Sequence, residues 1–179
     1  MTTAVMTAPT ALQAPETAPA PRRLGLCVVL AIMALWEAYE GLSNVSMLFG
    51  DMSEIPGPGF GGFLIKAHTA AQPVLGLAAL LFAVTGGVRY AIIALAANVI
   101  MNWLNYMPSV VLHGLDFGGM SAFVTPAQMI AFPLMAACAI AYAARNQRLG
   151  IATMLVSIPT LFNLFFVLAF AISVAIYGF

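Results

Sequence analysis

The stretch that decides the fold is residues 24–49, LGLCVVLAIMALWEAYEGLSNVSMLF. It is long enough to cross a bilayer as an α-helix, which takes about 20 mostly apolar residues. It nevertheless contains Glu37 and Glu40, and an acid in the middle of a span costs about 2.5–3.5 kcal/mol on the insertion scale. A membrane helix with two acids is expected to turn them toward the interior of a helical bundle rather than toward lipid.

The composition of the whole chain agrees with a membrane protein. Of its 179 residues, 63% are hydrophobic and only 7% are charged, whereas soluble domains carry about 25% charged residues. This small number of charged residues cannot cover a water-facing surface. We therefore expect an integral membrane protein surrounded by lipid bilayer. The net charge of zero argues against nucleic acid as a partner.

The order along the chain predicts a short tail followed by one all-α bundle. Residues 1–21 are rich in Ala, Thr and Pro and are expected to be disordered. Residues 22–179 are expected to form a transmembrane helical bundle. Five segments are long and apolar enough to span, namely 24–49, 66–85, 90–112, 126–144 and 149–177. If the segment after Pro126 is re-entrant, the bundle has four spans.

The positions of the basic residues predict the orientation. Five spans place all the arginines on one face: Arg22, Arg23, Arg89, Arg145 and Arg148. Because positive charge is retained on the cytoplasmic side, the N-terminus is expected to be cytoplasmic. Asp51, Glu54, Asp116, His68 and His113 then lie on or near the outer side, together with Lys66.

Polar side chains form stripes on the predicted spans. Glu37, Glu40 and Asn44 fall within about 60° of one another on a helix, as do Asn98, Asn102 and Asn105. Counted at about 1.5 Å per residue from the arginines, Gln72, Gln128 and Asn163 reach the same depth, beyond the midplane toward the outside. The sequence therefore predicts an outward-leaning polar cavity, lined by Glu37, Glu40, Asn44, Gln72, Asn98, Asn102, Asn105 and Asn163.

Charge chemistry limits what such a cavity holds. Two neighbouring carboxylates disfavour double ionisation, so at least one is expected to bind a proton or meet a cation. The alternative is that the amides only hydrogen-bond between helices, each bond contributing about 0.6 kcal/mol.

Two further chemistries stay open at this point. His68 and His113 are predicted at the outer ends of adjacent helices, where they could ligate one haem or, with Met47, Met107 or Glu40, a copper ion. No spacing motif supports a metal site, which favours ordinary interfacial histidines without a ligand. Four aromatic residues flank the polar stripes: Trp36, Tyr39, Trp103 and Tyr106. They are expected either to pack between helices or to stack on a quinone ring.

No motif of a known enzyme class is present in the sequence. Gly57, Gly59 and Gly62 match G-x-G-x-x-G, but without the strand and helix that a nucleotide site needs. There is no G-x-S-x-G, H-E-x-x-H, C-x-x-C or Walker loop. Whether the protein is an enzyme is left open, with a non-enzymatic role favoured and no cofactor required.

Residues 76–100, GLAALLFAVTGGVRYAIIALAANVI, resemble the central part of DoxX-like small membrane proteins. The resemblance rests on a Gly-rich apolar helix, a short turn with an arginine and an Ala-rich helix, through Gly76, Gly86, Gly87 and Arg89. The chain departs from the family in its fifth span and in lacking an acidic residue at the start of the second helix. The resemblance implies a small bundle, sometimes an accessory subunit of a quinone-linked respiratory or sulfur-oxidising complex.

Three functions follow from these patterns. The first is a multi-pass protein of the bacterial inner membrane whose cavity binds or passes a small polar molecule, cation or proton. The second is an accessory subunit of a redox complex that holds a quinone or one haem. The third is a structural partner, in a membrane complex or a homo-oligomer, whose polar layer only locks helices together.

Overall fold

The computed structural model describes residues 20–49, 59–115 and 121–178, which are almost entirely helical and contain no strand. The helices are α1 (Ala20–Asn44), α2 (Phe60–Val84), α3 (Val88–His113), α4 (Ser121–Pro126), α5 (Phe132–Ala144) and α6 (Leu149–Tyr177). A 3-10 turn, Val45–Leu48, extends α1, and a π-helical segment, Ala127–Ala131, joins α4 to α5. The predicted all-α class is confirmed.

Five helical stretches within the described ranges are long and apolar enough to cross a membrane. They are Arg23–Leu48, Phe60–Val84, Val88–His113, Ala122–Ala144 and Leu149–Tyr177. The fourth combines α4, the π-helical segment and α5 into one continuous helix. Its length matches a full span, which favours five spans over the four-span alternative.

Two helix starts were predicted wrongly, and both lie in glycine-rich sequence. Helix α2 begins at Phe60, whereas the span was predicted from residue 66. The first turn contains Gly61 and Gly62, which favour a loop by intrinsic propensity. A side chain at Gly61 would approach the Pro108 ring of α3, so glycine here allows the two helices to pack closely. In the same way α4 begins within the predicted outer connection, at Ser121.

Other predictions fall partly or wholly outside the described residues. Helix α1 includes Ala20 and Pro21, which were predicted in the tail, and the rest of the tail is not described. Asp51, Glu54 and Asp116 also lie outside the described ranges.

Helices α1 and α2 cross at two glycines. A Cβ atom added to Gly41 would lie 2.6 Å from the backbone nitrogen of Pro73. A Cβ added to Gly76 would lie 2.6 Å from the backbone nitrogen of Ala38. Backbone atoms cannot move aside, so each position needs glycine for this approach. Small residues at helix crossings are a common way of packing membrane helices.

One half of the bundle is closed by small apolar side chains. Buried alanines of α1, α2, α3, α5 and α6 form most of this core, and α3 packs against both α2 and α5. The buried alanines of the core include Ala34, Ala79, Ala83, Ala91, Ala96, Ala136, Ala139, Ala143 and Ala152. Alanine has no polar side-chain atom, so the alanine side chains of this core leave no hydrogen-bonding group to satisfy.

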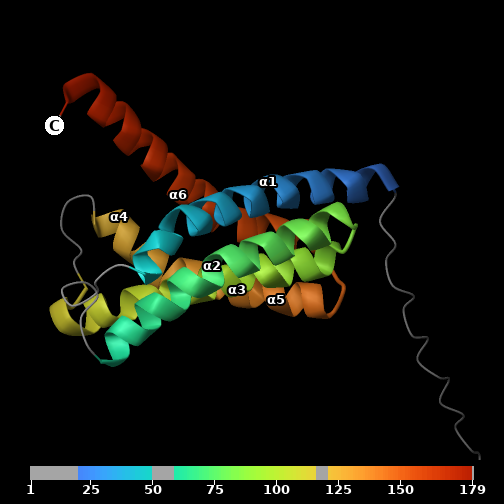
Figure 1. The fold of residues 1–179 in the computed structure, drawn as a ribbon. Helices are drawn as coiled ribbons and strands as arrows, with labels where there is room; N and C mark the ends of the chain where they lie inside the picture. Colours follow the sequence, from blue (N-terminus) through green and yellow to red (C-terminus); the bar gives the residue numbers. More distant parts are fainter. Residues whose placement is uncertain (1–19, 50–58, 116–120, 179) are drawn as a thin grey trace, which may run out of the picture.

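The described arginines gather at the end of that same half. Both tight turns, between α2 and α3 and between α5 and α6, lie at this end beside the start of α1 (Figure 1). The Arg23 guanidinium donates a hydrogen bond to the carbonyl oxygen of Gly86 at 3.2 Å. At the opposite end, the last part of α6 extends away from the other helices (Figure 1).

Candidate functional site

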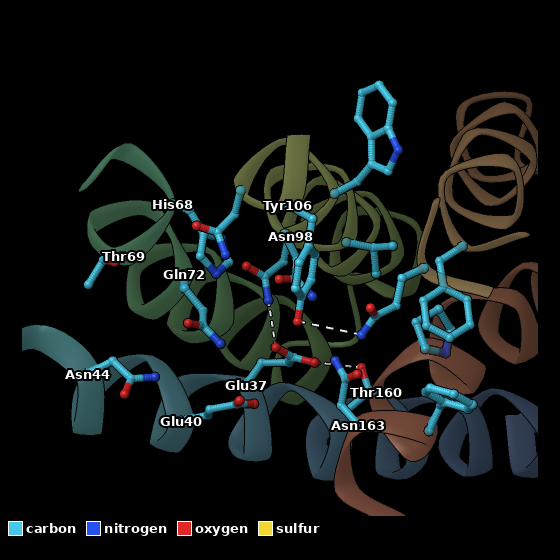
Figure 2. A pocket seen from close by; sticks show the side chains of 18 of the residues that line it. Glu37, Glu40, Asn44, His68, Thr69, Gln72, Asn98, Tyr106, Thr160 and Asn163 are labelled. Atoms are coloured by element: carbon cyan, nitrogen blue, oxygen red, sulfur yellow. Dashed lines mark hydrogen bonds between the residues drawn. The ribbon is translucent and has the colours of Figure 1, made fainter. Parts of the chain in front are cut away.

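A cavity of about 490 Å³ lies in the half of the bundle away from the arginine turns. Its walls come from the last part of α1, the first half of α2, the second half of α3 with the residues just before it, the fourth span around the π-helical segment, and the middle of α6. Its polar lining consists of Glu37, Glu40, Asn44, His68, Thr69, Gln72, Asn98, Asn102, Trp103, Asn105, Tyr106, Gln128, Thr160 and Asn163. Carboxylate, amide, imidazole, hydroxyl and indole groups thus meet in one space (Figure 2).

The structure brings all eight predicted cavity residues to this one lining. Glu37, Glu40 and Asn44 come from α1 and Gln72 from α2. The amide stripe Asn98, Asn102 and Asn105 comes from α3, and Asn163 from α6. That they bind a ligand there stays a prediction.

The two histidines, by contrast, lie in different surroundings. His68 lies inside α2, is 9% exposed and lines the cavity, and not the outer edge where it was predicted. The reason is the earlier start of α2, which adds almost two turns before it. His113 is the exposed last residue of α3, does not line the cavity, and its Nδ1 lies 3.2 Å from the Ser109 carbonyl oxygen.

Glu37 is the most completely bonded polar group of the cavity. Its side chain is 6% exposed. The Asn98 amide of α3 donates to Glu37 Oε2 at 2.7 Å, and the Thr160 hydroxyl of α6 donates to Oε1 at 2.7 Å (Figure 2). Hydrogen bonds that involve an ionisable carboxyl are stronger than neutral ones. Glu37 therefore connects three helices.

Glu40 lies one turn further along α1, is half-buried, and has a different set of neighbours. Trp36 lies one turn before Glu40, and its buried indole Nε1 has no hydrogen-bond partner among the described residues. In Figure 2 Glu40 lies beside Glu37. Of the two acids, Glu40 is the one with acceptor capacity to spare.

Three buried atoms of the lining residues have no hydrogen-bond partner among the described residues: Asn98 Oδ1, Asn105 Oδ1 and His68 Nδ1. The orientation of the Asn98 amide follows from Glu37, because the carboxyl takes the NH₂ group and leaves the oxygen free. Amide oxygens accept hydrogen bonds and do not donate them, and a ring nitrogen of neutral histidine can also accept. Buried polar atoms are usually satisfied, so these three atoms are open to a hydrogen bond from water or from a ligand in the cavity.

Aromatic rings form the apolar part of the lining. The rings of Phe132 and Phe162 meet edge to face with centroids 5.2 Å apart, and Phe162 and Phe166 lie 4.7 Å apart. All three residues line the cavity, from α5 and α6. The cavity therefore has polar groups from all five spans and an aromatic side formed by Phe132 at the start of α5 and by Phe162 and Phe166 in the middle of α6.

The π-helical segment shapes the side of the cavity that carries Gln128. Within it the Phe132 amide donates to the Ala127 carbonyl five residues back. Pro133 has no N–H, so the carbonyl of Met129, four residues before it, lacks its usual α-helical partner. The Trp103 indole of α3 donates to this carbonyl at 3.1 Å. Gln128 faces the cavity and lies 3.5 Å from the Tyr106 hydroxyl.

The charges around the cavity have one sign. Its lining contains two carboxylates and no lysine or arginine. Within the described ranges, no group of three or more His, Cys, Asp or Glu residues is placed to hold a metal ion. The geometry therefore suits a partner that is positively charged or rich in hydrogen-bond donors.

Several lining residues were not among the predicted site residues. Thr160 lies three residues before Asn163, so the i, i+3 rule places both on one face of α6 and could have identified it. Thr69, which follows His68 in α2 and lay within the predicted span, was also not predicted as a cavity residue. The aromatic side could not be seen, because Phe132 and Phe162 are far apart in the sequence.

Comparison of the chain with protein-family models, with curated proteins and with solved structures gives no match. The resemblance to DoxX-like proteins therefore stays a prediction.

Proposed function

We propose that this chain is a multi-pass protein of the bacterial inner membrane whose cavity binds, or passes, a small cation or cationic polar molecule. The observation that carries the proposal is the lining itself, which has two carboxylates, unpartnered amide oxygens and no lysine or arginine. In a site of low dielectric, such a lining attracts positive charge much more strongly than it would in water. Intramembrane acids that face a cavity typically mark an ion or substrate path.

The proposed orientation places the cavity in the outer half of the membrane. The arginines that the structure describes lie at the opposite end of the bundle, and positive charge is retained on the cytoplasmic side. A reporter fused after Phe179 should therefore be active outside the cytoplasm, and one inserted in the turn at 145–148 should be active inside. If both reporters indicate the same side, this orientation is wrong.

The binding proposal is tested by thermal stability of the purified full chain in detergent. A ligand that binds only the folded protein raises its melting temperature. Small cations, such as sodium and methylammonium, and matched anions, such as acetate, form the test panel. We expect stabilisation by at least one cation and by none of the anions, and we expect Glu40→Gln to abolish it. Stabilisation by anions or neutral molecules alone would contradict the proposal.

The interhelical bonds of Glu37 support a second candidate, a purely structural polar layer. Both carboxyl oxygens are bonded to other helices, which is the expected geometry of a helix tie. It explains Glu37, but not the half-buried Glu40 or the unpartnered amide oxygens.

The aromatic side supports a third candidate, a quinone head group. Quinone carbonyls accept hydrogen bonds, however, and the unpartnered amide oxygens are acceptors too, so the two do not complement each other. An ultraviolet–visible spectrum of the purified protein with a bound quinone would reverse this preference.

A further inference from the structure

The cavity combines two chemically different sides, and the difference specifies its ligand. We infer that it accommodates an organic amine: one protonated nitrogen joined to a compact apolar body, with an aromatic ring as the best fit. The inference rests on the proposed cation binding and goes further, since it names the part of the ligand that carries no charge.

The position of the nitrogen follows from the free acceptors. Glu37 already receives hydrogen bonds from Asn98 and Thr160, so Glu40 is the carboxylate with room for a new donor. Asn98 is 3% exposed, its Oδ1 is unpartnered, and it lines the same cavity. A primary ammonium has three donors in different directions, which suits a carboxylate and nearby amide oxygens better than one hydroxyl does.

The size of the cavity argues against a bare metal ion as its ligand. Metal ions are held by ligand atoms at about 2.0–2.6 Å, which requires a compact site. A volume of about 490 Å³ instead lies within the range of small-molecule sites. The ligand must therefore fill space beyond its charged group.

The apolar body follows from the rings of α5 and α6. Phe132 meets Phe162 edge to face, Phe162 meets Phe166 at a tilt, and all three residues line the cavity, where a further aromatic ring can pack against them. Trp103 and Tyr106 also line the cavity, and aromatic faces attract organic cations. In Figure 2 the labelled residues of α2 lie on one side of Glu37, and Thr160 and Asn163 of α6 lie on the other. These labelled residues are polar, so the phenylalanine cluster supplies the apolar part of the lining.

The test uses tryptophan fluorescence of the purified full chain in detergent. The chain has two tryptophans, and Trp103 lines the cavity. Benzylamine is the probe, benzyl alcohol is its neutral isostere, and methylammonium is its charged part without the ring. We expect a saturable change in fluorescence with benzylamine. The affinity for benzyl alcohol and for methylammonium should each be lower by about tenfold or more.

Neighbouring phenylalanines supply a matched pair of variants. Phe166 lines the cavity, whereas Phe165 does not and is exposed. Phe166→Leu should weaken benzylamine binding and leave methylammonium binding unchanged, and Phe165→Leu should change neither. Glu40→Gln should weaken both amines. The comparison of the three ligands on the unaltered protein needs no variant and decides the question even if a variant does not fold.

The outcomes separate this inference from the proposed function. Equal affinity for methylammonium and benzylamine would overturn the organic-amine inference and leave cation binding intact. Equal affinity for benzyl alcohol and benzylamine would overturn both, because charge would then contribute nothing. A failure of every amine to bind while sodium stabilises the protein would overturn the inference in favour of an inorganic cation.

Discussion

In the half of the bundle that carries the arginine turns, the core consists mainly of alanine with a few larger aliphatic side chains, whereas the other half buries carboxylate and amide groups. Alanine lets helices approach closely and leaves no polar atom to satisfy. In the cavity half, larger polar side chains line a space of about 490 Å³ that no side chain fills. The same five membrane-spanning stretches thus pack into an apolar core at one end and surround a polar cavity at the other.

The difference suggests a division of tasks along each helix. Close packing of alanine can hold the helices in register without help from polar bonds. Each unpartnered buried acceptor at the polar end costs about 1–3 kcal/mol of stability. The packing of the apolar end offsets this cost. Glu37 lies where the two ends meet, next to Ala38 at the glycine crossing of α1 and α2.

The largest expected effect comes from removing the carboxyl at this junction. Glu37→Leu leaves the Asn98 amide and the Thr160 hydroxyl without their acceptor, which costs about 1–3 kcal/mol for each. Glu40→Leu removes no hydrogen bond of good geometry and is the matched control. Thermal unfolding in detergent should show a large loss for Glu37→Leu and a small one for Glu40→Leu. Equal losses would show that Glu37 is not a helix tie.

A smaller effect is expected from the glycine crossing. Gly76→Ala places a methyl group 2.6 Å from the Ala38 backbone nitrogen, and overpacking of this kind costs about 1–3 kcal/mol. Gly25→Ala is the control, because nothing lies within 4 Å of its added Cβ. The same melting measurement should show destabilisation for Gly76→Ala and no loss for Gly25→Ala. Two neutral results would mean that α1 and α2 are further apart than described.

The smallest effect is expected at the π-helical segment. Trp103→Phe removes one hydrogen bond to the Met129 carbonyl, worth about 0.5–1.5 kcal/mol. Tyr106→Phe removes a contact of 3.5 Å with Gln128, which is long for a hydrogen bond and should matter less. A melting temperature lowered more by Tyr106→Phe than by Trp103→Phe would contradict this ranking.

The sequence predicted the helices and the polar stripes because both depend on local periodicity. Glu37, Glu40 and Asn44 repeat at helical spacing, so their shared face could be read from the residue numbers. That two helices would present such faces to the same space followed from the cost of exposing acids to lipid.

The pairing of individual atoms could not be predicted in this way. Glu37 bonds to Thr160, 123 residues away, and only the packing of α1 against α6 brings them together. Nor does local propensity predict the start of α2, where Gly61 and Gly62 favour a loop but close packing against α3 favours a helix. Tertiary contacts prevailed over intrinsic preference at that point.

The π-helical segment also has a consequence for insertions and deletions. Its hydrogen bond from Phe132 to Ala127 spans five residues, so Ala127–Ala131 contains one residue more than an α-helix would need. Deletion of one residue here would restore a regular helix and rotate everything before it by about 100°. Val124 and Gln128 would then turn away from the cavity, although no lining residue had been replaced. The length of this segment, as much as its composition, determines which side chains the fourth span presents to a ligand.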